Sequence, residues 1–190
     1  MVRGAGCRSA TVRQQDGKRL SGAGQGGVLA LGVEFRVLGP LEVIDEGREV
    51  ALGGPRQRAL LAVLLLHANE TLSADRLVDE LWGESPPPTA VKTVQVQVSR
   101  LRKALGRDLL VTREQGYRLE LDPGRLDSQR FERLVAEGRA ELAVEHLETA
   151  EAALEAALSL WRGRPLDDLA YETFAQREVA RLEELRLTAR

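Results

Sequence analysis

Five basic residues and no acidic one lie in the stretch 89–107, with Gln and Ser side chains between them. Lysine and arginine bind phosphates, while Gln, Ser and Arg can hydrogen-bond to base edges. This mixture therefore has the chemistry needed to contact a groove of DNA. The residues that supply it are Lys92, Gln95, Ser99, Arg100, Arg102 and Lys103.

The same stretch has the apolar spacing of a helix. One face is formed by apolar residues at steps of three and four, namely Val91, Val94, Val98, Leu101 and Leu105. The polar and basic side chains then lie on or near the opposite face, with Val96 and Arg100 at its flanks. A surface helix whose charges meet only water would fit this stretch equally well. The neighbouring elements must decide between the two interpretations.

Three elements are predicted before this helix. Residues 35–52 contain three short β-prone runs separated by Gly-Pro and Asp-Glu-Gly, which predict a small antiparallel sheet. Residues 55–68 begin with proline and are apolar almost all round, which predicts a buried helix. Ser73 and Gly83 have the residue types of an N-cap and a C-terminal stop, so a shorter helix is expected at 74–82.

A hairpin is predicted after the basic helix. Residues 109–121 alternate apolar and polar side chains around a turn at 113–116, where Gly116 can adopt a positive φ. Three helices followed by a hairpin form a winged helix-turn-helix, whose third helix enters the major groove with the hairpin beside it. Helix 89–105 is therefore the predicted recognition helix, and hairpin 109–121 is the predicted wing.

Several blocks of this sequence resemble known regulators. TVQVQVSRLRKALG and LLVTREQGYRLEL resemble the recognition helix and the wing of OmpR/PhoB-type effector domains, which carry an N-terminal sheet ahead of the helices. LGPLEV, LGGPRQRALLAVLLLHAN and LSADRLVDELWGESPPPTA are similar to SARP-type transcriptional activators, the regulators of actinobacterial secondary-metabolite gene clusters. The resemblance covers roughly residues 35–190.

Three further helices are predicted near 128–142, 144–161 and 171–189. Small and large apolar residues alternate along them, which is typical of TPR-like helical hairpins. The helical spacing places Leu142 on the apolar face of the first helix and Leu147 on that of the second. This segment resembles the opening of the bacterial transcriptional activation domain of SARP-type proteins. In the family that domain continues further, so we expect a truncated domain with exposed apolar surface. Either pairing with a partner chain or early termination would explain it.

The predicted fold class is thus α+β: a winged helix-turn-helix with an N-terminal antiparallel sheet, followed by an all-α TPR-like domain. The expected divisions are an extension at 1–33, an OmpR/PhoB-type domain at 34–122 and the helical domain at 126–190. The extension is rich in Gly, Arg, Ser and Gln without apolar periodicity, which predicts disorder. Its G-x-G-x-x-G match has no strand before it, so a chance match is favoured over a dinucleotide site.

Charge limits the DNA interpretation to one face. Residues 35–121 contain twelve basic and twelve acidic side chains, whereas residues 122–190 contain ten and fifteen. A segment with no net charge can bind DNA only where its cations cluster, and the basic helix supplies that cluster. No run approaches the roughly 18 apolar residues of a membrane span, so no membrane partner is expected.

No set of residues suggests catalysis. A G-x-x-x-x-G-K-[ST] phosphate loop is absent from the sequence, and His67 and His146 lie on separate predicted helices. Cys7 is the single cysteine, and Asp167 and Asp168 fit a loop leading into a helix better than a metal pair. We therefore expect a protein that is not an enzyme and has neither a cofactor nor a metal site.

The predicted function is that of a sequence-specific DNA-binding transcriptional regulator. The resemblance implies an activator of secondary-metabolite genes that binds direct repeats in promoter DNA and recruits RNA polymerase, and it allows a homodimer on DNA. A cytoplasmic, nucleoid-associated location is expected. The alternative is a protein-interaction module whose helical repeat binds a partner while the winged helix serves as scaffold.

Each predicted contact has a role. Lys92, Arg102 and Lys103 are assigned to phosphates, and residues 95, 96, 99 and 100 to base edges, while the wing arginine reaches a phosphate or the minor groove. The motif SRLRKAL supports Arg100 and Arg102 most directly. The predicted DNA-contacting residues are Lys92, Thr93, Gln95, Val96, Ser99, Arg100, Arg102, Lys103 and Arg113.

Overall fold

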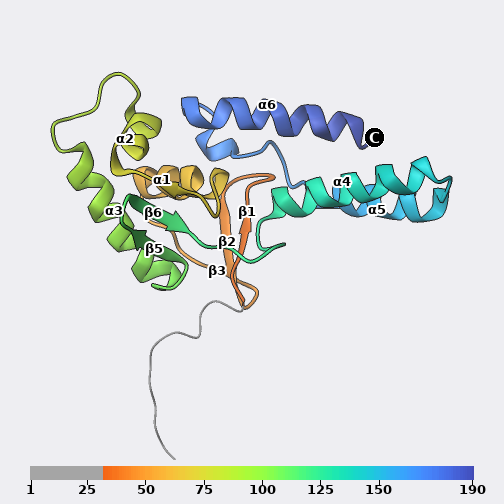
Figure 1. Cartoon of the computed structure of the whole chain (residues 1–190), viewed down its shortest axis with the longest axis horizontal. Coiled ribbons are helices and arrows are strands. Elements are labelled where there is room, and N and C mark those ends of the chain that lie inside the picture. Colours follow the sequence, from red (N-terminus) through yellow and green to blue (C-terminus); the bar gives the residue numbers. More distant parts are fainter. Residues whose placement is uncertain (1–31) are drawn as a thin grey trace, which may run out of the picture.

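The computed structural model describes residues 32–190 (Figure 1). The predicted disordered extension lies outside the described residues, except for its last two positions. In chain order the elements are β1 (Glu34–Arg36), β2 (Glu42–Asp45), β3 (Arg48–Glu49), α1 (Pro55–Leu66), β4 (Thr71–Leu72), α2 (Ala74–Trp82), α3 (Ala90–Leu105), β5 (Leu110–Arg113), β6 (Gly116–Leu119), α4 (Asp127–Ala143), α5 (Leu147–Ser159), the short 3-10 helix η1 (Asp167–Leu169) and α6 (Thr173–Thr188).

The N-terminal sheet packs on the buried helix α1. Its strands are antiparallel in the order β1-β2-β3, and Phe35 lies opposite Val43 with both side chains fully buried. Eight of the twelve residues of α1 are buried, as the apolar run predicted, although the helix ends at Leu66 and not at Ala68. The predicted sheet and central helix are therefore confirmed.

The local signals at α2 are also confirmed. The Ser73 hydroxyl accepts a hydrogen bond from the Arg76 amide at 3.1 Å, which satisfies an amide that the first turn of the helix leaves unpaired. Gly83 ends the helix with φ 58°, a conformation that a residue without Cβ adopts readily.

The wing contains a strand that the sequence did not predict. β4 pairs with β6, so the hairpin belongs to a three-stranded sheet in the order β4-β6-β5. A two-residue strand has no alternation to detect, and its partners Tyr117 and Arg118 lie more than forty positions away in the sequence. The predicted hairpin itself is confirmed.

The buried stripe of α3 differs from the predicted one at its start. Ala90 is buried, whereas Val91 is 42% exposed, so assigning Val91 to the inward face was wrong. The helix begins at Ala90, and the next residue is turned by about 100° around a helix of 3.6 residues per turn. Val94, Val98 and the later members of the stripe are buried as predicted.

The three C-terminal helices do not lie side by side as successive members of a regular helical repeat. α4 and α5 pair as a hairpin, while α6 runs back across α1 and α2 (Figure 1). Leu142 is 46% exposed and Leu147 is 65% exposed, although the spacing places each on the apolar face of its helix. Both lie beside the turn that joins α4 to α5, where no other element of residues 32–190 covers them.

The winged-helix part and the helical part share their cores. Leu166, Leu169 and Val179 belong to the cluster that surrounds α1. Conversely, Leu38 from the β1–β2 loop is fully buried in the second cluster, with Phe131 and its neighbours. The helical part is therefore packed into the body of the winged helix. None of the helices in the described part of the chain is long and apolar enough to cross a membrane.

Candidate nucleic-acid interface

The outward face of α3 brings six of the predicted contact residues together. Their side chains are exposed, and among the described residues none of them has a side-chain hydrogen bond or an ion pair; they are Lys92, Gln95, Val96, Ser99, Arg100 and Lys103. Val96 is 41% exposed on this polar face. Free donors and acceptors, a methyl-bearing side chain and three cations can together contact phosphates, base edges and thymine methyl groups.

Thr93 lies at the margin of this face. Its side chain is half-buried, and its hydroxyl donates a hydrogen bond to the carbonyl of Thr89 at 2.9 Å. Such a bond to the preceding turn is common for threonine in helices. The hydroxyl proton is therefore used within the helix, and only the oxygen lone pairs stay available to a ligand.

Arg102 is half-buried and points toward the wing. Its Nε donates a hydrogen bond to the carbonyl of Leu110 at 2.7 Å, and one terminal nitrogen donates to the Thr112 hydroxyl at 2.6 Å. Its guanidinium carbon also lies 6.0 Å from the ring centre of Tyr117, within the range of a cation–π contact. Among the predicted phosphate contacts, this side chain is thus already engaged with the hairpin.

The wing carries its own charged group. Arg113 forms an ion pair with Glu120, and the Nε of Arg118 lies 3.7 Å from the same carboxylate. Both arginine side chains are more than one-third exposed, so these pairs are weak and the cations can also attract phosphates.

The base of the wing depends on Gly116. A Cβ at this position would lie 1.9 Å from the Leu72 carbonyl oxygen of β4, and the backbone has φ 151°. Only glycine allows two backbone segments to approach so closely.

A hollow of about 500 Å³ separates α3 from the wing. Its walls include Ser99 and Lys103 from the helix and Thr112 from the hairpin, and Arg107 lies at the end of the helix. Cationic groups on the helix side and hydroxyl groups on both sides suit a sugar–phosphate strand passing between the two elements.

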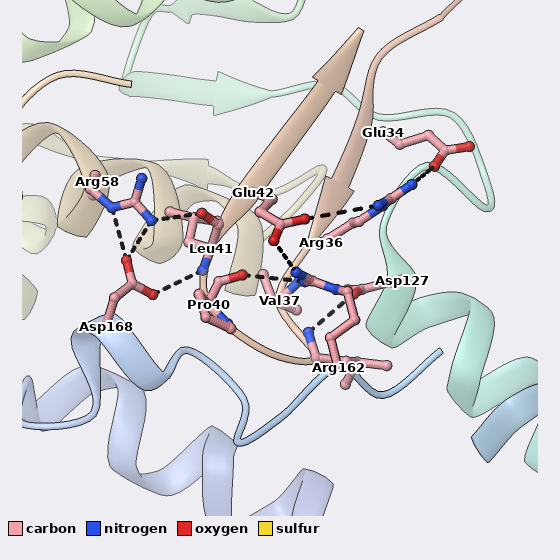
Figure 2. Close-up of polar contacts among 11 residues, drawn as sticks. Glu34, Arg36, Val37, Pro40, Leu41, Glu42, Arg58, Asp127, Arg162 and Asp168 are labelled. Carbon is pink, nitrogen blue, oxygen red and sulfur yellow. Dashed lines mark hydrogen bonds and ion pairs between the residues drawn. The ribbon is translucent and has the colours of Figure 1, made fainter. Parts of the chain in front are cut away.

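A second polar cluster joins the helical part to the N-terminal sheet (Figure 2). The carboxylate of Asp127, at the start of α4, accepts hydrogen bonds from the amides of Val37 and Leu38 at 2.7 and 3.0 Å. Arg162 lies 3.7 Å from the same carboxylate and forms an ion pair with Glu42 at 2.6 Å. The β1–β2 loop is thus bound to Asp127, which lies about ninety positions later in the sequence.

Asp168 of η1 binds both α1 and the residue that precedes β2. Its carboxylate accepts a hydrogen bond from the Leu41 amide at 2.8 Å and from the Nε of Arg58 at 2.8 Å (Figure 2). Arg58 in turn donates to the Leu41 carbonyl at 2.6 Å. The sequence presented Asp168 only as part of a loop. Its acidic neighbours in the sequence gave no sign of partners more than one hundred positions away.

Burial raises the pKa of Asp127 above its ordinary value, because the interior disfavours the charged carboxylate. The amide hydrogen bonds and Arg162 oppose that rise without cancelling it. His67 lies at the end of α1 near Glu70, Arg76 and Glu80, which agrees with a helix-end residue. Across residues 32–190, no group of three or more His, Cys, Asp or Glu side chains could hold a metal ion.

Two family models match the chain in succession. Residues 47–119 match the model described as transcriptional regulatory protein, C terminal, and residues 126–190 match the bacterial transcriptional activator domain. Regulatory protein DnrI of Streptomyces peucetius is 36% identical over 166 residues, covering 82% of this chain and 61% of DnrI. Regulatory protein AfsR of Streptomyces coelicolor is 40% identical over 156 residues, covering 82% of this chain and 16% of AfsR.

The chain belongs to the SARP-type regulators. A solved structure of Mycobacterium tuberculosis EmbR, in complex with a low-affinity phosphopeptide, superposes on this SARP-type chain with a TM-score of 0.80 at 36% identity. It covers 83% of this chain and 43% of the EmbR chain. Transcriptional regulatory protein MoaR1 of M. tuberculosis is 40% identical, and the match spans 49% of its length. The present chain thus spans about half the length of the MoaR1 proteins that it matches.

The comparisons confirm the family and the fold class predicted from the sequence, and they agree with a transcriptional regulator. They leave the contact residues and the domain limits 34–122 and 126–190 as predictions. The residues that sequence reasoning missed are those of the inter-segment cluster, chiefly Asp127, Asp168 and Arg162, together with the use of Arg102 by the wing.

Proposed function

We propose that this chain binds double-stranded DNA sequence-specifically and activates transcription of secondary-metabolite biosynthesis genes. α3 enters the major groove and the β5–β6 hairpin flanks the duplex. The observation that carries the proposal is the exposed face of α3, where the cations Lys92, Arg100 and Lys103 lie among polar side chains without any acidic residue. In a chain with a net charge of −2, this concentration of cations is local.

The roles divide by position on the helix. Lys92 and Lys103 are point charges that hold phosphates, whereas Arg100 can form a two-bond contact with a guanine edge. Gln95, Ser99 and Val96 face base edges, and Val96 is suited to a thymine methyl group. Thr93 assists at the margin, and Arg113 of the wing reaches a neighbouring phosphate or the minor groove.

A salt titration tests DNA binding directly. The whole chain is titrated with random duplex DNA at increasing salt, and then with duplexes selected from a random pool. We expect the logarithm of the affinity to fall with the logarithm of salt by about 0.9 for each neutralised phosphate. Absence of binding at low salt would remove the proposal. The whole chain is used because the winged helix shares its core with the helical part.

The partners follow from the family. We propose promoter DNA with direct repeats, recruitment of RNA polymerase by the helical part and a homodimer formed on DNA, all in the cytoplasm close to the nucleoid. The match of residues 47–119 to the C-terminal model of transcriptional regulatory proteins supports the DNA partner, and the match of residues 126–190 to the activator-domain model supports the recruitment of RNA polymerase. In vitro transcription from a promoter that carries the selected sequence, with and without this chain, measures activation.

The second candidate is a protein-interaction module with the winged helix as scaffold. Exposed Leu142, Val144 and Leu147 at the α4–α5 turn favour it, because apolar side chains grouped on a surface often contact a partner. The salt titration separates the two candidates, since a scaffold has no reason to bind DNA more tightly as salt falls.

A further inference from the structure

We propose that Arg102 is a positioning residue that fixes the wing against the recognition helix, so that contacts made by the two elements depend on each other. This inference rests on the proposed DNA binding. It gives Arg102 a role different from the direct phosphate contact that the sequence predicted.

Arg102 contacts both strands of the hairpin, by hydrogen bonds to β5 and by a cation–π contact to β6. Leu110 and Thr112, its hydrogen-bond partners, belong to β5, and Tyr117, whose ring lies beneath the guanidinium, belongs to β6. Within residues 32–190, no other side-chain hydrogen bond joins α3 to the hairpin. The polar link between the two DNA-facing elements is therefore made by one side chain.

The opposite side of the wing is already fixed. β6 pairs with β4, and the close approach of Gly116 to Leu72 leaves no room for sliding there. On the α3 side, Leu110 of β5 is buried in the same cluster as Leu101 and Leu105 of the helix, which fixes the base of the wing. Above this contact a hollow of about 500 Å³ separates the two elements, and Arg102 is among the residues that line it. We infer that the angle between the outer part of the wing and the helix depends on the bridge that Arg102 makes.

The geometry requires arginine. Two bonds leave different nitrogens of one planar guanidinium, while a lysine ammonium is a single point without that fork. A side chain whose only task is to attract a phosphate would tolerate lysine, because the charge is kept. The Arg102→Lys variant therefore separates the two roles.

The experiment uses the whole chain and a duplex selected from a random pool. Affinity and its salt dependence are measured by fluorescence anisotropy for Arg102→Lys, Thr112→Val, Arg113→Ala and the Thr112→Val/Arg113→Ala double variant. Thr112→Val removes the hydroxyl partner without removing a charge. Arg139→Lys is the matched control, because Arg139 is exposed on α4, which lies on the opposite side of the molecule from α3 (Figure 1). Thermal melting of each variant checks that it is folded.

We expect Arg102→Lys to weaken binding about tenfold with an unchanged salt slope, while Arg139→Lys binds as the unaltered chain does. Arg113→Ala should weaken binding about fivefold in the original chain but less than about twofold in the Thr112→Val background. The effects of the two substitutions on affinity would then not add, which shows that the contacts of the wing and of the helix are coupled. A side chain that only stabilised the fold would not produce this result.

Two results would overturn the inference: full binding by Arg102→Lys, or an equal effect of Arg113→Ala in both backgrounds. Failure of the unaltered chain to bind any duplex at low salt would instead remove the proposed function. The two failures are therefore distinguishable.

Discussion

The side chains of α3 fall into two groups that the sequence could not separate. Arg100 and Arg102 are two positions apart and carry the same charge. Arg100 is exposed and has no side-chain partner among residues 32–190, whereas Arg102 is bound to the hairpin. A helical turn of 3.6 residues points them in directions that differ by about 200°. Charge alone therefore does not assign a role, and the surroundings of each guanidinium must.

Arg100→Ala should weaken binding to a selected duplex by about 1–3 kcal/mol and relax the preference at one base pair, as loss of a direct base contact does. Lys103→Ala should weaken binding to all duplexes alike and lower the salt slope by about one. Anisotropy titrations on selected and scrambled duplexes measure both. A uniform loss with Lys103→Ala and no change with Arg100→Ala would contradict the assigned roles.

Asp127→Asn should destabilise the fold by about 1–3 kcal/mol at neutral pH. Asparagine offers one acceptor oxygen where the carboxylate offers two, so one of the buried amides of Val37 and Leu38 loses its partner. Urea unfolding, followed by circular dichroism, measures the loss.

The same variant carries a pH signature. Because burial raises the pKa of Asp127 above its ordinary 3.8, the folded chain binds that proton more tightly than the unfolded chain does. The stability contributed by this group is therefore largest at low pH and falls as pH rises through the window above 3.8. Asp127→Asn lacks this titration, so the stability advantage of the original chain should shrink with rising pH across that window. An advantage that grew there would contradict the assigned cause.

At the scale of elements, β4 decides how the wing is anchored. Gly116→Ala should destabilise the chain by about 3 kcal/mol, because the new methyl group would overlap the Leu72 carbonyl and the backbone has a positive φ. Gly163→Ala is the matched control, since in the described part of the chain no atom beyond its immediate sequence neighbours lies within 4 Å of the position that a Cβ would take. Thermal melting compares the two. Equal melting temperatures would show that the wing can move away from β4 at little cost.

Local signals in the sequence specified most elements. The Ser73 cap, the Gly83 stop and the apolar run of α1 depend on neighbouring residues only, so they could be predicted. β4 could not, because Thr71 and Leu72 form a strand only through pairing with distant β6. The contacts of Asp127 and Asp168 escaped prediction for the same reason.

At the scale of the whole molecule, the two parts should unfold together. Trp82 lies in α2 and Trp161 follows α5, so the chain has one tryptophan in each part. Trp161→Phe and Trp82→Phe each leave a single fluorescent reporter, and we expect coincident denaturant midpoints because the cores are shared.

Leu38→Ala extends this test. Leu38 is fully buried in the second cluster although it belongs to the N-terminal sheet region. Its truncation should cost about 2–5 kcal/mol and shift the midpoints of both reporters together. Two separate transitions, or a shift of one reporter alone, would show that the parts are independent.

The placement of Leu38 and Asp127 also bears on how such regulators can be recombined. A crossover in the loop 122–124 would join a β1–β2 loop from one parent to an α4 start from another. The loop amides would then face a residue 127 from the other parent, and Leu38 would have to pack against that parent's second cluster. A new DNA specificity is thus more safely imported by exchanging the outward residues of α3 than by exchanging the winged helix as a cassette.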